Sequence, residues 1–166
     1  MVSLEDIPFK ERWKIASKSA SFVPLMYDSH FRKVLGEKYD EIERPIWIEA
    51  GKEIKNLAMS LGLPSGNARQ IGETLGIINS ISYGPESRYE TLEETKHGVI
   101  GKMTGCAILN SAMQMGLDPK IVALPACRTL IRSAVESLNP DYTILPGTMN
   151  MCSGDNYCEL VIERRR

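Results

Sequence analysis

The sequence lacks any apolar run near the roughly 20 residues that a membrane-spanning helix needs, and its start lacks the apolar segment of a signal peptide. It also lacks a strong charge of either sign. The formal net charge is -1 over 166 residues, which gives no support to a nucleic-acid partner. We therefore expect a cytoplasmic protein that binds neither membranes nor nucleic acid. With 43% hydrophobic and 25% charged residues, the composition is typical of an ordinary globular domain.

Histidine is scarce, which limits the general bases that the chain can offer. Only His30 and His97 are present. We expect His30 to be partly buried in a helix and His97 to be exposed at a turn between strands. The glycine pattern of a phosphate-binding loop is also missing, because Gly72 and Gly76 fall inside a predicted helix and not between a strand and a helix. These two glycines instead predict a close approach by another helix.

The periodicity of apolar residues changes in the middle of the chain. Spacings of three and four recur in the first half and predict helices, with Pro24 interrupting or beginning one of them. This half is also a candidate oligomer interface. The fold class that follows is α+β, with a helical subdomain over residues 1–84 and a small antiparallel sheet covered by helices over residues 85–166. The remaining expected elements are helices at about 40–61, 67–83, 105–115 and 125–138, and strands at 87–95, 98–104, 141–151 and 157–164.

Four cysteines, Cys106, Cys127, Cys152 and Cys158, all lie in the last 61 residues. The pattern places Cys106 and Cys127 in the first turns of helices, where unpaired N–H groups favour a thiolate. We therefore predict a low pKa for both thiols. Cys158 falls on the apolar face of the last strand, and a five-residue turn predicts that Cys152 lies directly opposite it.

Three or four sulfur atoms are thus predicted to converge between the helix starts and the last hairpin. Four thiolates suit Zn(II) or an iron–sulfur cluster, although the spacing matches neither a C-x2-C zinc ribbon nor a compact ferredoxin run. Two alternatives stay open. Only one or two thiols belong to a functional site, or all four pack as small hydrophobic side chains.

The stretch "CSGDNYCELVI", following Cys106 at a helix start and then Cys127, resembles the L-2-amino-thiazoline-4-carboxylate hydrolase-like family and related archaeal and bacterial proteins. It is also similar to vinyl-4-reductase-type small-molecule-binding domains. The similarity covers about residues 85 to 163 and implies an α+β domain with a cysteine-lined small-molecule pocket. It further implies hydrolysis of a C–N bond in a cyclic amidine-like substrate. The matching residues, none of them a histidine, are Cys106, Cys127, Gly154, Asp155, Cys158 and Glu159.

Two functions follow as hypotheses. The first is a small-molecule-binding protein in which Cys106, Cys127, Cys152 and Cys158 hold zinc or an iron–sulfur cluster. The alternative is a hydrolase in which Cys106 or Cys127 is the nucleophile. Asp155 and Glu159 are weak candidates for its base, because the first suits a tight turn and the second alternates outward. A purely structural role for the cysteines is a third interpretation.

Overall fold

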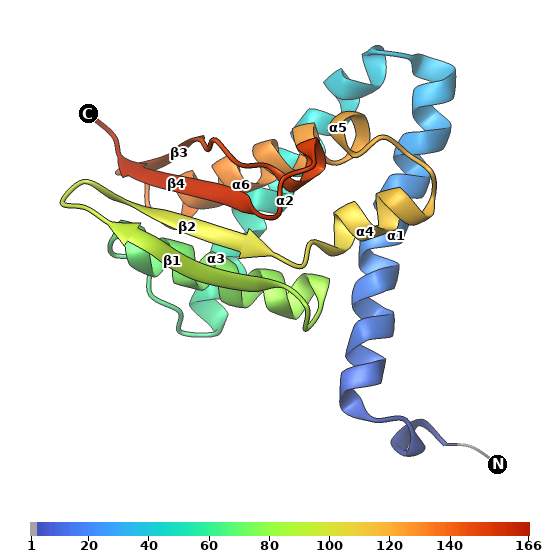
Figure 1. Ribbon diagram of the computed structural model, residues 1–166, viewed down its shortest axis with the longest axis horizontal. Coiled ribbons are helices and arrows are strands. Elements are labelled where there is room, and N and C mark those ends of the chain that lie inside the picture. Colours follow the sequence, from blue (N-terminus) through green and yellow to red (C-terminus); the bar gives the residue numbers. More distant parts are fainter. Residues whose placement is uncertain (1–2) are drawn as a thin grey trace.

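The structure is a computed structural model that describes residues 3–166, and its α+β architecture confirms the predicted fold class (Figure 1). Among these residues, no helix combines the length and the apolar character needed to cross a bilayer. The strands are β1 (Arg88–Glu94), β2 (Gly98–Thr104), β3 (Tyr142–Pro146) and β4 (Cys158–Arg164). The helices are α1 (Phe9–Leu35), α2 (Lys38–Ser60), α3 (Ala68–Tyr83), α4 (Ala107–Gln114), α5 (Pro119–Val122) and α6 (Leu124–Leu138), with short 3₁₀ helices η1 (Leu4–Asp6) and η2 (Met151–Ser153).

The strands form one antiparallel sheet in the order β1-β2-β4-β3. Helices α3 and α6 pack against the sheet, and α2 packs along α6. The long helix α1 contacts α4 and the end of α3, so the helices α1, α4 and α5 lie beyond one end of the strands (Figure 1). The space between these helices and α2 and α6 is separate from the core beneath the sheet.

The main core lies between the sheet and helices α3 and α6. Val99 and Ile162 are directly paired across β2 and β4, and both are fully buried. They meet Ile71 and Leu75 from α3 and Val135 from α6 in one apolar cluster. This cluster draws residues from both sides of the subdomain boundary that the sequence predicts. The division of the chain at residue 84 stays a prediction.

Helix α1 buries a polar stripe. Its buried residues, spaced three or four apart, are Ser17, Ser21, Leu25 and Asp28. The predicted interruption at Pro24 is wrong, because α1 continues through it. Most of the large apolar side chains that predicted this helix are exposed instead. Phe9, Ile15, Met26, Phe31 and Leu35 are among them. Self-association through the helical half stays a prediction.

Glycines mark two close approaches. Gly72 and Gly76 of α3 leave room for the ring of Tyr89 on β1, where added Cβ atoms would collide with that side chain. The expected helix contact at these glycines is therefore wrong, since a strand side chain fills the space. The close helix–helix approach occurs at Gly51 instead. A Cβ there would lie 2.6 Å from the Leu130 carbonyl oxygen on α6.

The last hairpin differs from its prediction. Strand β3 ends at Pro146, which pairs with Leu160, and the chain then leaves the sheet. Residues 151–153 form η2, so Cys152 does not lie directly opposite Cys158. The Cys158 Sγ instead accepts a long contact from the Met151 N–H at 3.4 Å. The predicted cross-strand pair of cysteines is therefore wrong.

Candidate functional site

The four cysteines come from four elements that meet at one end of the sheet. Cys106 is the N-cap residue of α4, and its Sγ accepts the Leu109 N–H at 3.4 Å. Cys127 lies in the first turn of α6, Cys152 lies in η2, and Cys158 begins β4. All four are free thiols of intermediate exposure. The predicted first-turn position is therefore confirmed for Cys127, whereas Cys106 lies one residue earlier, at the N-cap of α4.

The thiols are near enough to affect one another electrostatically. Burial raises the pKa of Cys127, and the charges of the other three thiolates raise it further. Burial also raises the pKa of Cys106 and raises that of Cys152 to about 11. The predicted low pKa at the helix starts is therefore wrong. Desolvation outweighs the N–H groups, so these thiols are neutral at neutral pH.

No group of three or more His, Cys, Asp or Glu side chains within residues 3–166 is arranged so that it could hold a metal ion. The four thiols share a neighbourhood but do not form a ready ligand set. A zinc or iron–sulfur centre on Cys106, Cys127, Cys152 and Cys158 stays a prediction.

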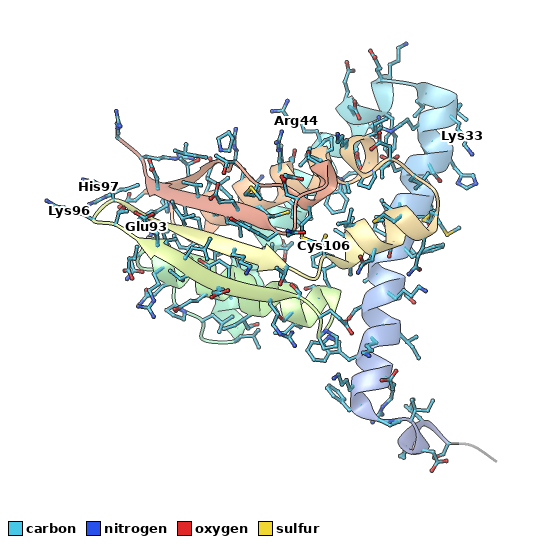
Figure 2. All side chains as sticks on the ribbon, in the orientation of Figure 1. Lys33, Arg44, Glu93, Lys96, His97 and Cys106 are labelled. Carbon is cyan, nitrogen blue, oxygen red and sulfur yellow. The ribbon has the colours of Figure 1, made fainter. Side chains whose placement is uncertain are left out.

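The histidines lie outside this neighbourhood. His97 is exposed at the β1–β2 turn, as predicted, at the opposite end of the sheet from Cys106 (Figure 2). His30 is also exposed, contrary to the expectation of partial burial, and its Nδ1 contacts the Met26 carbonyl oxygen at 2.9 Å. Asp155 accepts the Asn150 N–H and Glu159 accepts the Thr148 N–H, each at 2.6 Å. Both carboxylates therefore stabilise the loop before β4 by accepting hydrogen bonds from its backbone.

A pocket of about 190 Å³ lies between the helices, next to the thiols. Cys127 connects the two features, because it belongs to the thiol group and also lines the pocket. The wall is mostly apolar, with a few polar groups at its ends. The lining residues from α1 and α2 are Ala20, Ser21, Pro24, Leu25, Asp28, Glu43 and Trp47, and those from α3 to α6 are Ser82, Tyr83, Ile108, Val122, Ala126, Cys127 and Leu130.

One end of the pocket carries buried carboxylates. Asp28 is 1% exposed and is held by Arg32 through two hydrogen bonds, Nε to Oδ1 at 3.1 Å and Nη2 to Oδ2 at 2.8 Å. Glu43 is 7% exposed, and its Oε2 lies 3.8 Å from the Arg32 Nη2. Burial raises the pKa of Glu43, and the Asp28 charge adds to the rise. The nearby Trp47 N–H opposes the rise, although its geometry falls short of a hydrogen bond.

The other end carries a phenol and a thiol. Burial raises the pKa of Tyr83 to about 12, and the charges of Cys127 and Cys106 add to the rise. The Tyr83 phenol and the Cys127 thiol are therefore neutral hydrogen-bonding groups at neutral pH. A wider groove of about 550 Å³ runs along α2 and α3 and shares four wall residues with the pocket. The shared residues are Trp47, Ser82, Tyr83 and Leu130.

Sequence reasoning missed most of this pocket. Asp28 and Arg32, four apart on one helix, were a local signal of an ion pair. Ser17 and Ser21 continue the stripe of Asp28 at helical spacing, and their hydroxyls donate to carbonyls of their own helix. Glu43 and Tyr83 gave no such signal, because other helices bring them to the pocket.

No family model, no curated protein and no solved structure matches this chain. The resemblance to L-2-amino-thiazoline-4-carboxylate hydrolase-like proteins stays a prediction.

Proposed function

We propose that the protein binds a small, largely apolar molecule in the pocket between α1, α2, α3 and α6. The observation that carries this proposal is the pocket itself, about 190 Å³ in volume, with an apolar wall and a few polar groups at its ends. Pockets of this composition are the usual sites of small-molecule binding, since apolar walls supply affinity and few polar groups fix orientation. A cavity of roughly 150 Å³ holds benzene, so a single-ring ligand fits.

Binding is testable with benzyl alcohol, a neutral single-ring probe. Trp47 lines the pocket, and Trp13 is the only other tryptophan. A Trp13→Phe background therefore makes Trp47 the reporter of the site. We expect saturable changes in Trp47 emission and a rise in Tm with probe concentration.

Two variants separate the pocket from the surface. Ala126 is buried and lines the pocket, so Ala126→Leu is expected to fill the space and abolish the response. Ala16 is exposed on α1, so Ala16→Leu is the matched control and should bind as the parent does. An unchanged response in Ala126→Leu, or none in the parent, would contradict the proposal.

A metal centre at the four thiols is the second candidate. Its support is that Cys106, Cys127 and Cys158 come from three different elements and affect one another's pKa. A bound cation would reverse this repulsion, because a coordinating thiol is deprotonated outright. Zinc or iron would require the thiols to draw closer than they are here.

Metal analysis of protein purified without oxygen tests this candidate. Stoichiometric zinc or iron that is lost in Cys158→Ser would support it. Absence of metal, with thiols that alkylate slowly in the folded state, would reject both the metal centre and the cysteine hydrolase. One fast thiol without metal would instead favour the hydrolase, with Cys106 or Cys127 as its nucleophile.

A further inference from the structure

The Glu43 carboxylate lines the pocket, and within residues 3–166 the only donors near it are the Trp47 indole N–H, whose geometry falls short of a hydrogen bond, and Arg32. The side chain is about nine-tenths buried and lines the pocket. No hydrogen bond joins it to any residue in the described part of the chain, and its nearest cation, the Arg32 Nη2, lies at 3.8 Å. That separation exceeds the length of a normal hydrogen bond. A buried carboxylate in this state favours any ligand that brings an N–H donor or a positive charge.

Arg32 directs its hydrogen bonds to other carboxylates and approaches Glu43 only at 3.8 Å. It donates twice to Asp28 and once to Asp40, with the Nη1 to Oδ1 distance to Asp40 at 2.7 Å. One guanidinium thus faces three carboxylates, Asp28, Asp40 and Glu43. The corner keeps an excess of negative charge at the end of an otherwise apolar pocket.

The remaining groups at this end also suit a cation. The wall contains no lysine, arginine or histidine. Pro24 has no N–H, so the carbonyl of Ala20, another lining residue, lacks its usual helical donor four residues on. The Trp47 indole adds an aromatic face, and aromatic faces attract cations.

We propose that the pocket binds a small organic cation of the protonated amine class, with the ammonium group at Glu43 and the apolar part against Leu25, Val122 and Leu130. This inference rests on the proposed function and names the ligand class of the same pocket. The volume allows about one six-membered ring with a short arm. Anions are disfavoured, because no lining cation would compensate their charge.

The test compares three probes of similar size at neutral pH: benzylamine, benzyl alcohol and benzoate. Binding is followed through Trp47 emission and by calorimetry. We expect benzylamine to bind roughly tenfold to hundredfold more tightly than benzyl alcohol, as for a hydrogen bond between charged partners. Benzoate is expected to bind more weakly than benzyl alcohol. Glu43→Gln should remove the preference for benzylamine and retain binding of benzyl alcohol.

Glu41→Gln is the matched control, since Glu41 is exposed on the same helix and does not line the pocket. It should keep the full preference. If Glu43→Gln loses its circular dichroism signal, Glu43→Asp replaces it. That variant withdraws the carboxylate by one methylene and should lower the preference severalfold.

The outcomes distinguish the two proposals. Equal affinity of the parent for benzylamine and benzyl alcohol, or an undiminished preference in the folded Glu43 variant, would overturn the amine inference and leave the pocket as a small-molecule site. If none of the three probes binds, the proposed function fails, and the inference that rests on it fails too.

Discussion

Beneath the sheet, the largest fully buried side chains are mostly apolar, whereas the corner between α1, α2 and α6 buries two carboxylates beside open volume. Ile71, Leu75 and Ile162 fill the first region at 0–2% exposure. Asp28 and Glu43 sit in the second, at 1% and 7% exposure. Apolar burial in the first region therefore raises the free energy of unfolding. The desolvated charges in the second region lower it.

Helix α6 contributes residues to both regions. Its first half gives Ala126 and Leu130 to the pocket, and its second half gives Ala134 and Val135 to the core. The same helix is thus anchored at one end and borders open space at the other. A buried charge beside a pocket is typical of a site kept for binding and not for stability.

The largest effect is expected from Arg32→Met. This change removes the cation that holds Asp28 and approaches Glu43, so two buried carboxylates lose their partner. Breaking a buried ion pair by removing one partner costs about 3–5 kcal/mol. We expect a loss of this size in the free energy of unfolding at neutral pH, measured by urea denaturation.

The control for Arg32→Met is Arg69→Met. Arg69 also pairs with a carboxylate one helical turn away, with the Nε to Glu73 Oε1 distance at 2.9 Å, but both side chains are about half exposed. Exposed pairs contribute at most about 1 kcal/mol. Similar losses in the free energy of unfolding would mean that the buried Arg32–Asp28 pair contributes no more to stability than the exposed Arg69–Glu73 pair.

A smaller effect is expected from one substitution made at two positions of α6. Ala134 is fully buried in the core, so Ala134→Leu forces extra atoms into a filled space and should cost about 1–3 kcal/mol. Ala126→Leu enters the pocket, where space is open, and should leave stability nearly unchanged or raise it. Thermal unfolding of both variants measures the difference. Equal destabilisation would show that the pocket is as tightly packed as the core.

The sheet and its helices were predictable because their signals are local. Alternating residues and a turn predicted a strand at 98–104, and β2 occupies that range. Pro125 predicted the start of α6 to within one residue. The path of α1 through Pro24 was not predictable in this way. Packing of α1 against α3 and α4 outweighs the missing hydrogen bond.

The candidate site was predictable only in part. Capping signals placed Cys106 and Cys127 at helix starts, but the direction of their pKa shifts depends on burial. A helix terminus contributes about 0.3–1 kcal/mol, and desolvation of a buried thiol exceeds it. The pocket needs Glu43, Tyr83 and Leu130 from three helices, and no local pattern specifies how those helices meet.

The smallest effect is expected from Glu43→Gln, which tests whether the pocket carboxylate costs stability. Burial raises the pKa of Glu43 above its ordinary value of 4.5. A raised pKa in the folded state means that this group contributes stability below pH 4.5 and loses that contribution as pH rises through the folded pKa. At neutral pH the ionised Glu43 therefore opposes folding, and Glu43→Gln should stabilise the protein by about 1 kcal/mol.

The pH dependence makes this prediction specific. The advantage of Glu43→Gln should shrink as pH falls from neutral through the raised pKa and should vanish near pH 4.5. Glu41→Gln, at an exposed position on the same helix, should show no such trend. Saturating benzylamine should reverse the order at neutral pH, because the amine binds the protein with the Glu43 carboxylate more tightly and therefore stabilises it more than Glu43→Gln. If Glu43→Gln is less stable than the parent at every pH without ligand, the carboxylate supports the fold and the contrast between core and pocket does not hold.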